Sequence, residues 1–179
     1  LILTKRLADD ILRGIEQSEF IAYFQPKVDA KTRQIVGMEA LVRWKHPVHG
    51  VLAPSAFLQV AEELNVVTVI DRLVFDQALT PCNRWIEQGL GIPSGSVNVS
   101  MRRLNDHELL NSLAGVPIQP GTVSFELLES IFLDDTDEVM SLNIEHLKGL
   151  GIDIDIDDFG TGHASIAGLL KLKPKRLKI

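Results

Sequence analysis

The sequence predicts an α/β fold built on a mostly parallel β-sheet, and three observations lead to this prediction. After an initial pair of strands, helical and strand-like segments alternate along the chain, which is typical of a parallel sheet with crossover helices. The expected strands are short and apolar, as strands buried on both faces are. Polar residues interrupt several of them near their carboxyl ends, the edge that carries the active site in such folds.

The first expected element is a helix over residues 4–18. It carries Leu7, Ile11, Leu12 and Ile15 at helical spacing, so we expect these four side chains on one side of the helix.

Two strand-like segments, 20–28 and 35–44, come next. Only the polar segment 29–34 separates them, which predicts a β-hairpin. A short helix over 54–64 is expected after the hairpin, because Pro54 suits the first turn of a helix.

The rest of the chain alternates regularly. We expect an amphipathic helix over 69–88 to end at Gly89 and Gly91, and a helix over 134–148 begins with acids that suit its dipole. The period of two in 152–156 indicates a strand. The other expected elements are the strands 96–99, 122–128 and 176–179 and the helices 103–113 and 164–171. A (β/α)8 barrel would need two more strands, so either the sheet is open or the chain stops before a barrel closes.

Size and composition limit the class of protein. With 179 residues the chain is long enough for one domain with a real core. Its formal net charge of −6 argues against a surface for duplex nucleic acid. Cys82 is the only cysteine, so no internal disulfide can form, and no apolar run reaches the ~18 residues of a membrane span. Leu1 is not a natural start, so we expect the chain to belong to a longer protein.

The segment from Ile152 to Gly162 is the strongest sign of chemistry. Asp157 and Asp158 stand side by side where a strand ends and a glycine-rich loop begins. Two such carboxylates stay ionised together only near a cation or strong donors. A divalent metal explains them most economically, and metals held by carboxylates usually serve phosphate chemistry.

Polar residues near the carboxyl ends of the expected strands form a larger set. Its members are Gln25, Glu39, Asn98, Glu126, Asp157, Asp158 and Lys178. Carboxylates from three strands and an asparagine carbonyl make an all-oxygen site, which suits Mg²⁺ or Mn²⁺ rather than zinc. We therefore expect the acids to converge around metal ions instead of being neutralised by basic neighbours. Lys178 could pair with the acids or contact an anionic substrate.

Structural roles stay open for single members of this set. Taken alone, Asn98 is more typical of a buried side chain that bonds to the backbone. Glu126 could equally pair with Lys178 or Arg43 in a salt bridge of the scaffold. The adjacent aspartates are harder to explain in this way. The five histidines show no ligand spacing.

Several motifs together resemble the EAL domain family. In order, they are YFQPKVD (23–29), MEALVRWKHPVHG (38–50), VNVS (97–100), FELLES (125–130), DDFGTG (157–162) and LKI (177–179). The resemblance implies a TIM-like (β/α)8 barrel whose first strand runs antiparallel to the others, here without its last strands and helices. Residues 1–179 would be a single domain, with 1–18 as a helix leading into the barrel. The implied activity is metal-dependent hydrolysis of the bacterial second messenger cyclic di-GMP to linear pGpG.

The resemblance also implies roles for individual side chains. Glu39, Asn98, Glu126 and Asp157 match metal ligands, and Asp158 matches the aspartate of a second site, so two Mg²⁺ or Mn²⁺ ions are implied.

The remaining matches concern residues that contact the substrate and one residue that anchors a loop. Lys178 matches a lysine near the attacking water and the phosphate, which makes it catalytic together with Glu39 and Asp157. Glu129 matches a glutamate that anchors the loop from Phe159 to Ser165. The residues that match those holding the dinucleotide are Gln25, Leu41 and Arg43.

The chain departs from the family pattern at three positions and at its end. Leu128 stands where threonine is usual, and His163 and Ala164 replace the usual Tyr-Ser, but none of these changes removes a ligand. The family continues beyond Lys178 with further catalytic residues, so we expect a chain that truly ends at Ile179 to be unstable or inactive. A homodimer, upstream sensory or regulatory domains and a cytoplasmic location are also implied. The alternative is an inactive EAL-like receptor that binds cyclic di-GMP or a protein partner.

Overall fold

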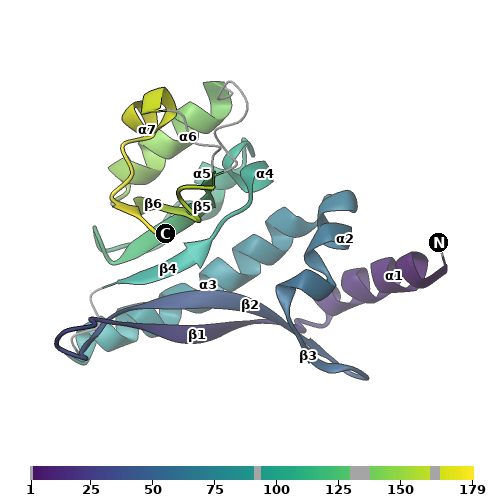
Figure 1. Cartoon of the computed structure of the whole chain (residues 1–179). Helices are drawn as coiled ribbons and strands as arrows, with labels where there is room; N and C mark the ends of the chain where they lie inside the picture. Colours follow the sequence, from purple (N-terminus) through teal and green to yellow (C-terminus); the bar gives the residue numbers. More distant parts are fainter. Residues whose placement is uncertain (1, 91–93, 130–137, 162–165) are drawn as a thin grey trace.

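The computed structural model describes residues 2–90, 94–129, 138–161 and 166–179. A seven-stranded sheet forms its centre, in the order β1-β2-β4-β5-β6-β7, with β3 paired to β2 (Figure 1). The strands are β1 (Phe20–Val28), β2 (Ile35–His46), β3 (Gly50–Leu52), β4 (Gly95–Asn98), β5 (Val123–Leu128), β6 (Asp153–Asp157) and β7 (Arg176–Leu177). The helices are α1 (Ile2–Glu16), η1 (Pro54–Ala56), α2 (Leu58–Glu63), α3 (Val67–Glu87), α4 (Met101–Leu104), α5 (Leu109–Leu113), α6 (Glu138–Gly149) and α7 (Ile166–Leu172).

The pairing of the strands confirms the predicted α/β class. β1 and β2 form the expected antiparallel hairpin, whereas β2, β4, β5, β6 and β7 pair in parallel. Within the described residues, β1 and β7 do not pair with each other, so the sheet is open. The first strand therefore runs antiparallel to β2, β4, β5, β6 and β7, as the resemblance implies.

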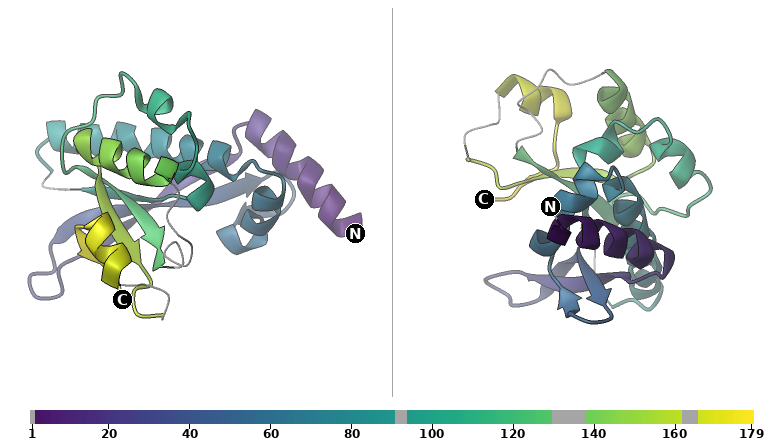
Figure 2. Two further views of the ribbon diagram at one scale, coloured as in Figure 1. Left: turned by 90° about the horizontal axis from the view of Figure 1, so that it is seen from above. Right: turned by 90° about the vertical axis from the view of Figure 1, so that its right-hand side faces the viewer.

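Helices cover the sheet and enclose the core. α3 packs against β1, β2 and β4, and α6 packs against β6 (Figures 1 and 2). Phe20 of β1 stacks on Trp44 of β2 with ring centroids 5.2 Å apart, and Phe57 meets Phe20 edge-on at 5.3 Å. Such aromatic pairs contribute about 0.5–1.5 kcal/mol each beyond the area they bury.

Helix α1 lies beside α2 and extends away from the sheet (Figure 1). Ile11 is fully buried, and Leu7 and Ile15 are partly buried against the core. Leu12, by contrast, is 44% exposed. The helix meets the body along a narrow stripe, so a residue one position from Ile11 already faces solvent.

The predicted helix over 103–113 is wrong as a single element, because α4 and α5 are separate. The side chain of Asp106 accepts a hydrogen bond from the Glu108 N–H at 2.9 Å, which favours a turn. Asn143 of α6 donates to the carbonyl oxygens of Leu104 (2.7 Å) and Asp106 (3.1 Å), and so satisfies the backbone where α4 ends.

The other predicted elements agree with the structure to within a few residues, apart from β3, which the sequence did not indicate. The predicted stop at Gly91 and the helix start over 134–137 lie outside the described residues. In the described part of the chain, every helix is too short or too polar to cross a lipid bilayer.

Gly95 allows close packing between β4 and α3. A Cβ atom at this position would lie 2.5 Å from the Sγ atom of the buried Cys82. We expect Gly95→Ala to lower the free energy of unfolding by about 1–3 kcal/mol, the usual cost of overpacking a core. In a double-mutant cycle by urea unfolding, Cys82→Ala should relieve most of this loss. An equal loss in both backgrounds would contradict the contact.

Candidate functional site

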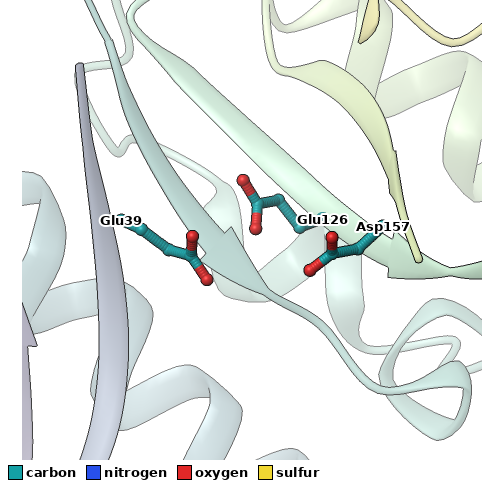
Figure 3. Close-up of side chains that lie close together, drawn as sticks. All are labelled: Glu39, Glu126 and Asp157. Atoms are coloured by element: carbon teal, nitrogen blue, oxygen red, sulfur yellow. The ribbon is translucent and has the colours of Figure 1, made fainter. Parts of the chain in front are cut away.

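Three carboxylates converge on one side of the sheet. Glu39 of β2, Glu126 of β5 and Asp157 of β6 point toward one another (Figure 3). One oxygen from each lies within 4.8 Å of the others. The parallel strands of one sheet bring such residues together at one edge although they are far apart in sequence.

Lys178, which follows β7, contacts all three carboxylates. Its Nζ atom lies 2.6 Å from Glu126 Oε2, 3.1 Å from Asp157 Oδ2 and 3.3 Å from Glu39 Oε2. The backbone N–H of Lys178 donates to the Ile156 carbonyl at 2.8 Å, which fixes its place beside β6. Burial by itself lowers the pKa of the Lys178 ammonium, but its bonds to Glu126 and Asp157 outweigh burial and raise it above the usual range.

Lys27 of β1 contacts the other carboxylate oxygen of Glu126. Its Nζ atom lies 2.5 Å from Glu126 Oε1 and 2.6 Å from Ser96 Oγ. Burial by itself raises the pKa of the Glu126 carboxyl, but bonds from Lys178, Lys27 and Ser96 lower it overall. Glu126 therefore remains ionised in a fully buried position.

These contacts correct one expectation from the sequence. Basic side chains neutralise the acids in part: Glu126 pairs with Lys27 and Lys178, so the expectation that the acids have no basic partners does not hold for this residue. The alternative pairing of Glu126 with Lys178 is confirmed. Arg43 is not its partner, because its Nη1 donates to the Val42 carbonyl at 2.7 Å.

Sequence reasoning missed Lys27. The signal that could have found it is its register: it stands two residues after Gln25, on the same face of β1, and its Cα partner in the hairpin is Gly37. A long basic side chain opposite a glycine can cross its neighbouring strand.

The other predicted site residues lie around this group. Asn98 Nδ2 donates to Glu39 Oε1 at 3.2 Å, so its amide bonds a carboxylate rather than the backbone. Asp158 is exposed, has a φ of 54° and donates its backbone N–H to Asp157 Oδ1 at 3.0 Å. It lies outside the group of three carboxylates that the described residues form. Gln25 is exposed on β1, where it is the Cα partner of Glu39.

Glu129 follows β5 and is 3% exposed. Its Oε2 atom accepts hydrogen bonds from Gly160 N at 3.0 Å, Thr161 N at 2.7 Å and Thr161 Oγ1 at 2.6 Å. It therefore ties the end of β5 to the segment after β6. Residues 162–165 of the predicted loop lie outside the described residues.

A pocket of about 280 Å³ borders the carboxylates. Its lining includes Asn98 and Glu126 of the site, together with Leu41, Leu58 and Asp71. Burial raises the pKa of the Asp71 carboxyl, although hydrogen bonds from Ser100 oppose this effect. The pocket thus combines apolar walls with the acidic side chains of Asp71 and Glu126.

The donor set fits a small divalent metal ion. Three carboxylates and the Asn98 amide supply oxygen ligands of the kind that Mg²⁺ and Mn²⁺ prefer. Ligands on opposite sides of Mg²⁺ lie about 4.2 Å apart, so oxygens within 4.8 Å need only small side-chain adjustments.

Sequence comparison places these residues in a known family. The family model of the EAL domain matches residues 8–179. The bifunctional diguanylate cyclase/cyclic di-GMP phosphodiesterase MucR of Pseudomonas aeruginosa is 32% identical over 97% of this chain. The oxygen sensor protein DosP of Escherichia coli is 31% identical over 93% of it. The chain spans 26% of the length of MucR and 21% of that of DosP.

Solved structures give the same result. The MucR phosphodiesterase in complex with c-di-GMP matches with a TM-score of 0.87 and 32% identity, over 97% of this chain and 72% of that one. The EAL enzyme Bd1971, bound to cAMP and cyclic di-GMP, matches with a TM-score of 0.86 and 26% identity, over 99% of this chain and 50% of that one. These matches confirm the TIM-like EAL fold, and the chain belongs to the EAL domain family.

Proposed function

We propose that the protein containing this chain hydrolyses cyclic di-GMP to linear pGpG at the site formed by Glu39, Glu126 and Asp157. The observation that carries this proposal is the meeting of three carboxylates from three strands with the ammonium group of Lys178. Membership of the EAL family and the likeness to proteins described in complex with c-di-GMP support it.

The residues proposed to hold a first Mg²⁺ or Mn²⁺ ion are Glu39, Asn98, Glu126 and Asp157, and Asp158 is proposed for a second. Ions bound there would supply Lewis-acid activation of the attacking water and of a phosphoryl oxygen. Three carboxylates against the two ammonium groups of Lys27 and Lys178 leave the site negative, and it would repel a phosphodiester without further cations.

Lys178 is proposed to contact the scissile phosphate. Its side chain is 30% exposed, and its ammonium group lies at the centre of the carboxylates. A fixed positive charge at this place stabilises the charge that develops on the phosphoryl oxygens during attack.

The pocket beside the carboxylates is proposed to take a guanine base of the substrate. Leu41 and Leu58 offer apolar contact to the ring, and Asp71 offers an acceptor for the ring N–H donors of guanine. Gln25 and Arg43 are proposed to hold the rest of the dinucleotide, and the guanidinium of Arg43 can bind a phosphate with two donors.

Asp71→Asn tests the base pocket. We expect KM for cyclic di-GMP to rise about 10-fold to 100-fold with kcat little changed, because a hydrogen bond to a charged group is lost. The free energy of unfolding at pH 7 should not fall: burial raises the pKa of Asp71, so its ionised form costs stability above that pKa, and asparagine avoids this cost. A destabilised variant with unchanged KM would mean that Asp71 is purely structural.

Turnover by the intact protein tests the function as a whole. We expect hydrolysis of cyclic di-GMP with Mg²⁺ or Mn²⁺, and its loss in Glu39→Ala. Tight binding without turnover would favour the receptor alternative. No turnover, with Glu39→Ala indistinguishable from wild type in binding as well, would contradict both. The homodimer, the upstream domains, the single domain over 1–179 and the cytoplasmic location stay predictions.

A further inference from the structure

Lys27 crosses the sheet beneath the carboxylates. It starts on β1, passes its Cα partner Gly37 on β2, and reaches Ser96 on β4 and Glu126 on β5. The Cβ atom that Gly37 lacks would lie 3.9 Å from Lys27 Cδ. This is an ordinary van der Waals distance, so the lysine stem passes directly beside residue 37.

Because of this contact, the two oxygens of Glu126 have different partners. Oε1 faces Lys27, whereas Oε2 faces Lys178 and the other two carboxylates. The Glu126 side chain is 0% exposed, so neither oxygen has water as an alternative partner. Ser96 Oγ holds the Lys27 ammonium from a second direction, and this fixes the orientation of the Glu126 carboxylate.

The number of oxygens that a carboxylate offers affects which metal binds. Ca²⁺ takes six to eight oxygen ligands and commonly binds a carboxylate through both of its oxygens, whereas Mg²⁺ demands a near-octahedral shell at shorter distances. A carboxylate restricted to one oxygen therefore favours the smaller ion.

We propose that Lys27 is a positioning residue that restricts Glu126 to one coordinating oxygen and so selects small octahedral cations against Ca²⁺. This proposal rests on the proposed metal-dependent function, because it assigns a selectivity to the same carboxylates. Lys27 acts through Glu126 and does not itself contact the metal ion or the substrate.

Competition between Mn²⁺ and Ca²⁺ tests this role without any measurement of turnover. Mn²⁺ bound to the intact protein is measured by electron paramagnetic resonance, and Ca²⁺ is added until half is displaced. Lys27→Met keeps the apolar stem and removes the ammonium. We expect this variant to retain Mn²⁺. After correction for its own Mn²⁺ affinity, the Ca²⁺ concentration that displaces half of the Mn²⁺ should be about tenfold lower than in wild type.

Two further variants control the experiment. Ser96→Ala removes one of the two groups that hold Lys27, so a smaller shift in the same direction is expected. Lys31→Met makes the same change of charge on an exposed turn residue. The ratio of its Ca²⁺ affinity to its Mn²⁺ affinity should equal that of wild type.

The outcomes separate this role from the proposed function. An unchanged ratio in Lys27→Met that still binds Mn²⁺ overturns the role of Lys27 alone. If Lys27→Met does not fold, the Ser96→Ala variant provides the test. An unchanged ratio of Ca²⁺ to Mn²⁺ affinity in Ser96→Ala then overturns the role of Lys27. A wild-type protein that binds neither ion overturns the metal-dependent function together with this role.

Discussion

Glu126→Gln is expected to reduce kcat for cyclic di-GMP hydrolysis by about a thousandfold. Glu126 is the member of the carboxylate group that both Lys27 and Lys178 contact. Its neutral amide would remove one anionic ligand and would turn an N–H donor toward one of the two ammonium groups. Changes to a preorganised electrostatic site cost this much in other enzymes, typically about 10²–10³ in kcat for one group.

The same variant should also be less stable, by about 2 kcal/mol at pH 7, because two ammonium groups lose their shared partner. This value lies below the roughly 3–5 kcal/mol of a fully buried pair, because the lysine side chains are 27% and 30% exposed and water weakens their interaction with Glu126. The native pKa of Glu126 is lowered, so its contribution is present above its unfolded pKa of about 4.3 and is lost as pH falls through the native value.

Urea unfolding across pH checks this prediction. The difference between wild type and Glu126→Gln should shrink on acidification below about pH 4.3. Glu87→Gln, a change at an exposed residue, is the matched control and should leave both kcat and stability unchanged. A Glu126→Gln variant with normal turnover would contradict the assignment of Glu126.

Lys178→Met is expected to have the second largest effect, a loss of about 10²–10³ in kcat, because a cation placed at the developing charge is removed. It also takes away the shared cation of Glu39, Glu126 and Asp157. The three acids then repel one another, so Mg²⁺ should raise the unfolding midpoint of the variant more than that of wild type.

The pH dependence of this second variant has a definite sign. The native pKa of Lys178 is raised, so its contribution to stability is complete below its unfolded pKa of about 10.4 and is lost only as pH rises through the native value. The destabilisation should therefore be constant between about pH 6 and 9. Lys45→Met, on an exposed part of β2, is the control. Equal Mg²⁺ effects on wild type and Lys178→Met would contradict the shared site.

Most of the fold could be predicted because local signals agree with tertiary packing. The hairpin strands β1 and β2 have apolar residues on both sides of a short polar turn, and both strands formed where expected. The single helix over 103–113 failed for a nonlocal reason. The bonds that end α4 come from Asn143, nearly forty residues away along the chain, and no local pattern shows them.

The candidate site likewise has residues that the sequence could predict and contacts that it could not. Polar residues in otherwise apolar strands indicated Glu39, Glu126 and Asp157, because a buried charge needs a partner. Which residue serves as that partner could not be predicted from the sequence. The contact between Lys27 and Glu126 joins β1 to β5, which are not neighbours in the sheet, so no local pattern in the sequence shows it.

The most direct measurement is an anomalous diffraction map from crystals of the intact protein soaked in Mn²⁺. We expect a peak within coordination distance of Glu39, Asn98, Glu126 and Asp157, with Glu126 contributing the oxygen that faces away from Lys27. A map without a peak there, in which Lys178 still contacts all three carboxylates, would contradict it.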